Sequence, residues 1–279
     1  MQYHSALMQP TLTFIGGGNM AGALIGGLIA AGHSSAHLRA AEPDPARAEI
    51  LRRQFGITVD SSAAALVKGA KALVLAVKPQ QVAAALQGLQ PDAGATVLSI
   101  AAGVRLETLR AALGANLHYV RSMPNTPALY GAGISGLYAP PGTPPNARQL
   151  AEEILRSAGE TVWLEREEDM DAVTALSGSG PAYFFLLTEV LREAGAALGL
   201  APDTAAKLAQ QTFIGAAAMA ANSGADVSQL RANVTSKGGT TEAAVRHLET
   251  AGIRSIFADA LRAAQQRGVE LGDLLAKGH

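Results

Sequence analysis

Short apolar runs alternate with helical segments between residue 11 and about residue 164. The runs that predict strands lie at residues 11–15, 38–41, 72–77, 96–100 and 117–120, with two edge strands at 133–138 and 161–164. Helices are predicted at 20–31, 46–55 and 147–157. Continuous apolar runs this short are typical of buried parallel strands. The alternation of strand and helix therefore predicts a doubly wound, mostly parallel α/β sheet.

Beyond residue 164 the strand signals vanish and the apolar residues follow helical spacing. The segment 182–198 carries, at this spacing, Phe184, Leu187, Leu191, Ala194 and Leu198. Further helices are predicted at 204–222, 227–232, 240–248 and 253–267. We therefore predict a sheet domain at 11–164 and an all-α domain at 165–279. The apolar helix faces predict a dimerisation domain whose interface is larger than that of a transient contact.

Composition excludes several kinds of chemistry. The chain has no cysteine, which excludes disulfides, thiolate metal sites and a cysteine nucleophile. With 22 basic and 23 acidic residues the formal net charge is −1, so we expect no binding to nucleic acid. The longest apolar stretch, 20–32, is too short to span a bilayer, and residues 1–9 are interpreted as a loose tail rather than a signal peptide. We expect a cytoplasmic protein with no membrane partner and no metal site.

A glycine-rich motif follows the first predicted strand and opens the first predicted helix. Residues 16–21 are Gly-Gly-Gly-Asn-Met-Ala, the G-x-G-x-x-A pattern of Rossmann dinucleotide-binding folds. The first glycine permits the tight turn, the third lets a pyrophosphate approach the backbone, and the alanine lets helix and strand pack closely. The alternative is a close-packing turn without a ligand. We predict cofactor contacts from Gly16, Gly18, Asn19, Met20 and Ala21.

Glu42, just after the second predicted strand, bears on the choice of cofactor. A carboxylate about 20 residues after the glycine motif can accept hydrogen bonds from the adenosine ribose. Its charge would repel the 2′-phosphate of NADP, which favours NAD. However, Arg39 and Arg47 are close enough in sequence to accommodate a phosphate, and Glu42 could instead be a solvated loop charge. The sequence therefore leaves both NADH and NADPH open.

Three later segments end predicted strands at the edge where open α/β sheets bind ligands. In the segment 77–79, Lys78 places a positive charge near the expected cofactor. The small residues of 99–104 would let a nicotinamide ring lie against the backbone, and 121–128 predicts a stiff polar loop. The alternatives are a solvent-facing lysine and a purely structural turn. We predict cofactor contacts from Val77, Lys78, Pro79, Ala101 and Gly103.

Six segments spread over residues 11–265 resemble the pyrroline-5-carboxylate reductase family. They are 14–21 (FIGGGNMA), 77–79 (VKP), 99–104 (SIAAGV), 121–128 (RSMPNTPA), 177–182 (SGSGPA) and 234–245 (VTSKGGTTEAAV). The resemblance implies a Rossmann domain and a helical domain that intertwines with a partner subunit. It also implies reduction of L-1-pyrroline-5-carboxylate to L-proline with NADPH or NADH. At least a homodimer is implied, and a ring of dimers is a further state that relatives form.

The same resemblance assigns site residues. It implies that Met123, Pro124 and Asn125 lie by the nicotinamide. The substrate would be held by Ser236, Gly238, Gly239, Thr240 and Thr241. Two positions depart from the pattern: Lys237 stands where many relatives have proline, and Glu42 where many have a small polar residue.

The expected reaction does not need a strong general acid. A pyrroline nitrogen is basic enough to be partly protonated near neutral pH, which fits the absence of the six histidines from the candidate loops. Backbone N–H groups of Gly238 and Gly239 are predicted to bind the substrate carboxylate. Thr241, the catalytic candidate, is predicted to hydrogen-bond the ring nitrogen. The alternative is that Thr240 or Thr241 only caps the following helix.

Two rival functions fit the sequence less well. Enzymes of the 3-hydroxyacid dehydrogenase type use a lysine general acid/base after the domain linker, but no lysine lies between Lys78 and Lys207. A non-catalytic dinucleotide sensor would have no need of the loop at 236–241.

Overall fold

The structure is a computed structural model that describes residues 9–277. The chain forms two compact units: unit 1 contains the residues up to Ser179 and those from Ala264 onward, and unit 2 is Gly180–Ala263. This division lies C-terminal to the predicted domain boundary at 164/165, and it assigns the end of the last helix to unit 1. Residues 1–8 of the expected tail lie outside the described residues.

Gln9, the last residue of the expected loose tail, is anchored. Its side-chain amide donates to the carbonyl of Gly32 at 3.0 Å, and its side-chain oxygen accepts from the N–H of Ser34 at 2.7 Å. The interpretation as a loose tail is therefore wrong at this residue.

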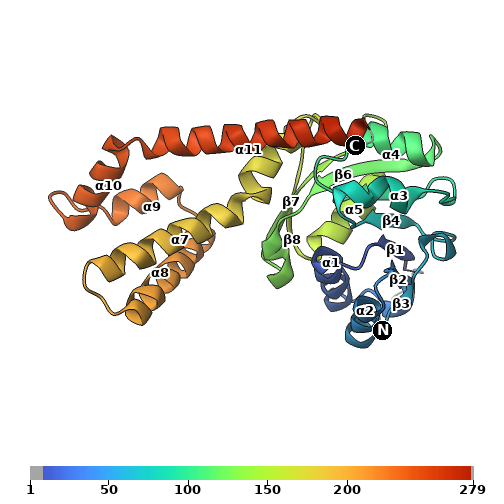
Figure 1. Cartoon of the computed structure of the whole chain (residues 1–279), viewed down its shortest axis with the longest axis horizontal. Helices are drawn as coiled ribbons and strands as arrows, with labels where there is room; N and C mark the ends of the chain where they lie inside the picture. Colours follow the sequence, from blue (N-terminus) through green and yellow to red (C-terminus); the bar gives the residue numbers. More distant parts are fainter. Residues whose placement is uncertain (1–8, 278–279) are drawn as a thin grey trace, which may run out of the picture. The chain divides into compact units, whose positions relative to one another are not determined.

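Unit 1 is built on an eight-stranded sheet in the order β3-β2-β1-β4-β5-β6-β7-β8 (Figure 1). The strands are β1 (Leu12–Ile15), β2 (Leu38–Ala41), β3 (Thr58–Asp60), β4 (Ala72–Leu75), β5 (Thr96–Ser99), β6 (His118–Met123), β7 (Gly133–Tyr138) and β8 (Gly159–Trp163). All neighbours are parallel except β6 and β7. The predicted doubly wound, mostly parallel sheet is confirmed.

The strand order reverses beside β1. β2 and β3 continue the sheet on one side, whereas β4 starts the other side. In open α/β sheets such a switch point opens a crevice at the carboxyl ends of the strands. Ile15 and Leu75 end β1 and β4 and pair in register, so the glycine motif and residues 76–79 leave the sheet side by side.

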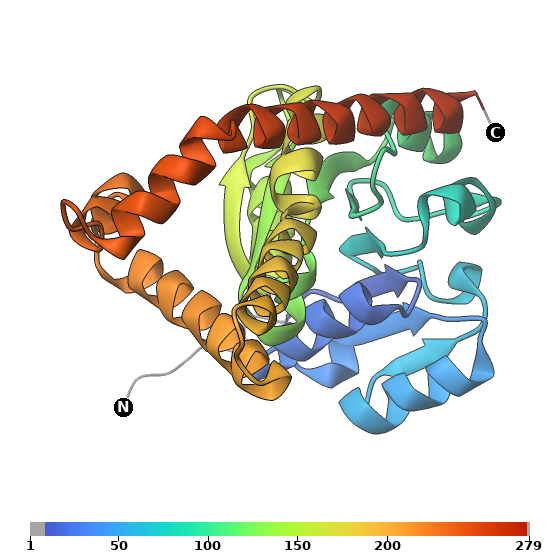
Figure 2. The same cartoon turned by 60° about the vertical axis from the view of Figure 1, so that its left-hand side comes forward.

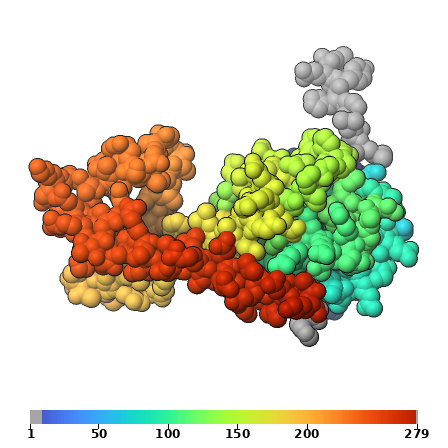
Figure 3. Space-filling model, turned by 90° about the horizontal axis from the view of Figure 1, so that it is seen from above, coloured from blue at the N-terminus to red at the C-terminus, as the bar shows by residue number. Residues whose placement is uncertain are grey.

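The side chains of the central strands alternate between two buried clusters, one on each face of the sheet. Phe14 and Val74 belong to the cluster formed with α1 (Asn19–Ala30), α2 (Pro45–Phe55) and α5 (Pro145–Arg156). Ile15 and Leu75 belong to the other, formed with α3 (Val82–Leu86) and α4 (Leu106–Leu113). The second cluster also contacts Leu275 of α11 (Ile253–Ala276), whose last turns lie on the surface of unit 1 (Figure 3).

Short elements complete unit 1. The 3-10 helices are Ser35–His37, Ala63–Ala65, Pro79–Gln81 and Thr126–Tyr130. After β8 the chain forms α6 (Asp169–Val173), which continues directly into a π-helix at Thr174–Gly178. Single-turn π-helices are rare and are frequently found at functional sites.

Unit 2 is entirely helical over its described residues. It comprises α7 (Gly180–Ala197), α8 (Pro202–Asn222), α9 (Val227–Asn233), α10 (Thr240–Thr250) and the first turns of α11. α7 turns back into α8 through residues 198–201 (Figure 2), and the rings of Phe184 and Phe213 stack at 5.6 Å between centroids. Phe185 and Leu191 of α7 remain 64% and 57% exposed, an apolar surface of the kind that a partner covers.

Several predicted boundaries are wrong. Residues 121–123 belong to β6 and not to the predicted loop, and the strand predicted at 72–77 ends at Leu75. α11 continues to Ala276, beyond the predicted end at 267. The sequence pattern also misses β3, because three residues are too few to show a periodicity. It also gives no helix at α3, α4 or α6.

Candidate active site

A large cleft opens at the switch point of the sheet, within unit 1. Its volume is about 1070 Å³, slightly above the range of roughly 300–1,000 Å³ that is usual for small-molecule sites. Its lining combines the glycine motif, the ends of β2, β4 and β6, and Gly178 of the π-helix. The predicted cofactor residues that line it are Gly16, Gly18, Asn19, Met20, Glu42, Val77, Lys78, Met123, Pro124 and Asn125.

The glycine motif is shaped by close backbone approaches. Gly16 has φ +98°, and a Cβ there would lie 2.8 Å from the carbonyl oxygen of Ala76. A Cβ on Gly17 would lie 2.5 Å from Cδ1 of Leu51. Gly16 therefore requires glycine. A side chain at Gly17 would displace the side chains of Leu51 and Glu42, although the G-x-G-x-x-A pattern treats this position as free and Gly17 was not predicted as a site residue.

Gly18 differs from its neighbours because it has room for a side chain. Its φ is −67°, and the nearest atom to a Cβ built there is Nη1 of Arg47 at 3.5 Å. It is the N-cap residue of α1, and no side chain caps the helix. The first N–H groups of α1 therefore have no intrahelical acceptor and can bind an anion such as a pyrophosphate. The cleft thus fits the phosphate end of a dinucleotide.

Two backbone N–H groups fix the carboxylate of Glu42 beside the glycine motif. It is only 9% exposed, Oε2 accepts from the N–H of Gly17 at 2.9 Å, and Oε1 accepts from the N–H of Asp44 at 2.9 Å. The alternative of a solvated loop charge is therefore wrong. Of the two arginines considered for a phosphate, Arg47 lines the cleft. Arg39 instead donates to the carbonyl of Lys68 at 3.0 Å.

Four of the predicted cofactor residues do not line the cleft. Ala21 is fully buried in α1, where its small side chain serves packing, and Pro79 begins a 3-10 helix. Ala101 is 3% exposed, and a Cβ on Gly103 would lie 3.5 Å from the backbone N of Gly272 in α11. The glycine at 103 therefore faces α11, and from the segment 99–104 it is Ile100 that lines the cleft.

The predicted substrate loop lies in unit 2, just before α10. The N–H of Gly238 donates to Oε2 of Glu242 at 2.7 Å, and the N–H of Gly239 donates to the carbonyl of Ser236 at 3.0 Å. Both amides, which were predicted to bind the substrate carboxylate, therefore have acceptors within the protein. α10 begins at Thr240 with Gly239 as N-cap, so neither threonine caps it. The N–H groups of Thr240 and Thr241 lie in the first turn, where intrahelical acceptors are lacking.

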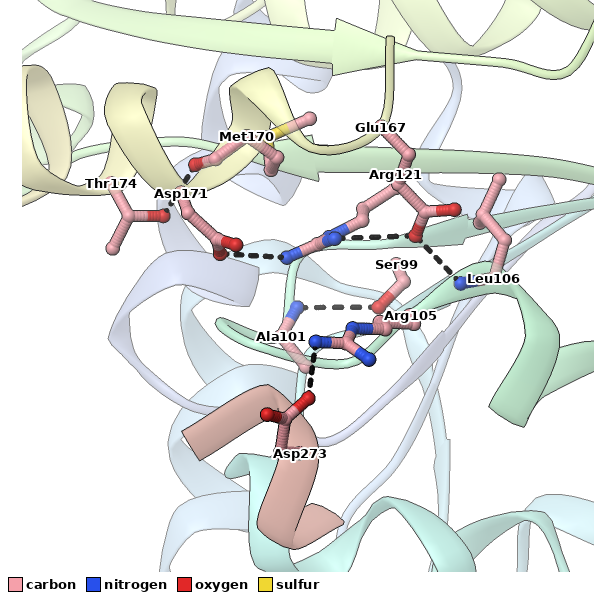
Figure 4. A network of polar contacts seen from close by, with 10 residues as sticks. All are labelled: Ser99, Ala101, Arg105, Leu106, Arg121, Glu167, Met170, Asp171, Thr174 and Asp273. Carbon is pink, nitrogen blue, oxygen red and sulfur yellow. Dashed lines mark hydrogen bonds and ion pairs between the residues drawn. The ribbon is translucent and has the colours of Figure 1, made fainter. Parts of the chain in front are cut away.

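Arg121 was predicted to lie in a polar loop, but it is a buried residue of β6. It is 3% exposed, and its guanidinium lies between Oε1 of Glu167 at 3.2 Å and Oδ1 of Asp171 at 3.6 Å (Figure 4). Oε1 of Glu167 also accepts from the N–H of Leu106 at 2.9 Å. Arg121 therefore joins β6 to α4 and α6 and is a structural residue.

Residues 9–277 lack two other kinds of site. No group of His, Asp and Glu side chains in this part of the chain has an arrangement that could hold a metal ion. Nor does any helix there have both the length and the apolar character needed to cross a membrane.

Two family models match the chain. Residues 167–271 match a model described as pyrroline-5-carboxylate reductase dimerisation, and residues 11–103 match one described as NADP oxidoreductase, coenzyme F420-dependent. A pyrroline-5-carboxylate reductase from Pseudomonas aeruginosa is 44% identical over 270 residues, which cover 96% of this chain and 99% of that protein.

Solved structures give the same picture. A pyrroline-5-carboxylate reductase from Coxiella burnetii has a TM-score of 0.89 at 39% identity, covering 94% of this chain and 98% of that one. The pyrroline carboxylate reductase of Plasmodium falciparum, solved with NADP bound, has a TM-score of 0.81 at 29% identity. The matched region covers 95% of this chain and 98% of the Plasmodium falciparum chain.

Proposed function

Because the chain belongs to the pyrroline-5-carboxylate reductase family, we propose that the glycine-loop cleft binds the NAD(P)H with which it reduces L-1-pyrroline-5-carboxylate to L-proline. The observation that carries the proposal is the cleft at the switch point of the sheet, which the glycine motif lines and where Gly16 makes the tight turn. The uncapped N-terminus of α1 beside it favours a pyrophosphate. Lys78 and Arg47 in the lining add positive charge.

The reacting end of the cofactor would lie in this cleft by Met123, Pro124 and Asn125. When bound, NAD(P)H would supply a hydride to the carbon of the C=N bond. The chain's own contribution is to orient the two reactants and to hold charge in place, which is how most of the rate would be gained. The pyrroline nitrogen is basic, so the substrate can bind already protonated on this nitrogen. The enzyme then needs no separate group to donate that proton.

The substrate would be held by the loop of Ser236, Gly238, Gly239, Thr240 and Thr241. With the amides of the two glycines engaged, the first-turn N–H groups of Thr240 and Thr241 are the donors suited to its carboxylate. The hydroxyl of Thr241 would hydrogen-bond the ring nitrogen and fix the face that receives hydride.

The assembly that goes with this function is at least a homodimer formed through the helical region. Exposed apolar side chains on α7 and α8, such as Phe185, Leu191 and Leu208, support burial against a second copy. A ring of dimers would be a higher state of the same assembly. A cytoplasmic location and the absence of a nucleic-acid partner complete the proposal, and the net charge of −1 supports the latter.

The first test is NADH and NADPH oxidation, followed at the nicotinamide absorbance with and without L-1-pyrroline-5-carboxylate. We expect oxidation only when the substrate is present. Gly18→Val provides the matched variant: its backbone conformation and free space tolerate a Cβ, but the side chain occupies the path of the pyrophosphate. It should fold and bind neither coenzyme. Oxidation at an unchanged rate in Gly18→Val would contradict the placement of the cofactor.

Glu42 should set the coenzyme preference. We expect Glu42→Gln to raise the ratio of kcat/KM for NADPH over NADH by about tenfold, since a like-charge repulsion of roughly 1–2 kcal/mol is relieved. Glutamine keeps an acceptor for the N–H of Gly17. Arg47→Gln should move the ratio in the opposite direction. Steady-state kinetics with both coenzymes measure this, and an unchanged ratio in both variants would remove these residues from coenzyme selection.

A further inference from the structure

The carbonyl of Ser177 cannot receive the usual helical hydrogen bond. In an α-helix a carbonyl accepts from the N–H four residues later. For Ser177 that residue is Pro181, which has no N–H. The chain is also widened here, because the N–H of Ser179 donates to the carbonyl of Thr174 at 2.8 Å, five residues back. The Ser177 carbonyl therefore needs a donor from elsewhere.

Asn125 provides that donor. Its Nδ2 donates to the carbonyl of Ser177 at 3.2 Å, across 52 residues of sequence. Its Oδ1 accepts from the N–H of Ile134 on β7 at 2.9 Å. A side-chain amide donates through its nitrogen and accepts through its oxygen at the same time. Asn125 thereby ties the π-helix to the sheet.

The hydrogen bond between Asn125 and Ser177 lies next to the wall of the cleft. Gly178, which follows Ser177, lines the cleft together with Met123 and Asn125. A Cβ on Gly178 would lie 2.6 Å from Cε of Met123, so the π-helix backbone packs directly on that side chain. A shift of the Ser177 carbonyl would move Gly178 and Met123 together.

We propose that Asn125 is a positioning residue for hydride transfer: its side chain supplies the hydrogen bond that Pro181 cannot make and so fixes the Gly178–Met123 wall. The inference rests on the proposed function, which places the nicotinamide against this wall. Asn125 therefore acts through the π-helix, and its side-chain amide is already engaged by the protein. Misplacing a reacting group by about 1 Å can cost roughly 100-fold in rate.

The test pairs the loss of the donor with its restoration. We expect Asn125→Ala to lower kcat by about 10–100-fold, with the Kd for NADH, measured by its fluorescence without substrate, changed less than threefold. Adding Pro181→Ala returns a backbone N–H four residues after Ser177. The Asn125→Ala/Pro181→Ala protein should therefore recover part of the lost kcat. Pro181→Ala alone should stay near the unchanged protein.

Asn125→Asp is the second variant, in case the alanine variant does not fold. It keeps the acceptor for the N–H of Ile134, and it replaces the donor to Ser177 by a carboxylate oxygen that cannot donate. It should lose kcat as the alanine variant does, again without losing NADH affinity. Unchanged kcat in Asn125→Asp, or a folded double variant that recovers nothing, would overturn the proposal. Failure of the proposed function is distinct, because the unchanged protein itself would then oxidise no coenzyme.

Discussion

Replacing Thr241 by alanine is expected to lower kcat/KM for L-1-pyrroline-5-carboxylate by about 100–1,000-fold, the usual effect of removing one preorganised donor from a reacting centre. Thr241 lies in the first turn of α10, beside N–H groups that have no intrahelical acceptor. Its hydroxyl would be lost from the ring nitrogen, whereas the cleft that binds the coenzyme is unaltered. The Kd for NADH should therefore change less than about twofold.

Two control variants sharpen this experiment. Thr241→Ser keeps the hydroxyl and should retain most of the activity. Thr250→Ala removes the same groups from the last residue of the same helix and should have no effect on kcat/KM. Turnover by Thr241→Ala equal to that of the unchanged protein would exclude Thr241 from the site.

The sequence predicts those parts of the fold that depend on neighbouring residues in the chain. The apolar runs of β1 and β4 are fully buried, so their pattern is continuous and easy to recognise. The turn at Gly16 needs a positive φ, which only glycine adopts readily, so the residue type itself reports the geometry. Glycine motif, parallel sheet and cleft edge were all predictable for this reason.

The parts that the sequence does not predict depend on contacts between distant segments. Asn125 and Arg121 stand in one polar motif, yet one binds a carbonyl 52 residues away and the other a carboxylate 46 residues away. Neither partner has a periodic signal that would connect it to the motif. The occupied amide of Gly238 escaped prediction for a different reason, because the pattern says nothing about which side chain reaches back to it.

Gly103 is a further position whose role depends on a contact with a distant segment. Its small size was interpreted as space for a nicotinamide, but the space is taken by the backbone of α11 at Gly272. A glycine reports that something comes close, and the sequence does not say whether that is a ligand or a helix. Glu42 is intermediate, since its position after β2 was predicted but its two backbone donors were not.

Among the substitutions considered, replacing Arg121 by methionine is expected to lower the free energy of unfolding most. The substitution keeps much of the apolar stem but leaves the carboxylates of Glu167 and Asp171, whose side chains are 24% and 14% exposed, without their cation. Breaking a buried ion pair in this way costs about 3–5 kcal/mol. At roughly 2–4 °C per kcal/mol, the midpoint of thermal unfolding should fall by about 6–20 °C at matched protomer concentration.

The control for this loss is Arg53→Met. Arg53 is 82% exposed and pairs with Glu49 on the surface of α2, so its removal should cost less than about 1 kcal/mol. A fall of that small size in Arg121→Met would show that water screens the network as it screens a surface pair. Adding Glu167→Gln and Asp171→Asn to Arg121→Met should recover part of the lost stability. This follows because the cost comes from unpaired charges rather than from the missing bond, and neutral amides can be buried at lower cost.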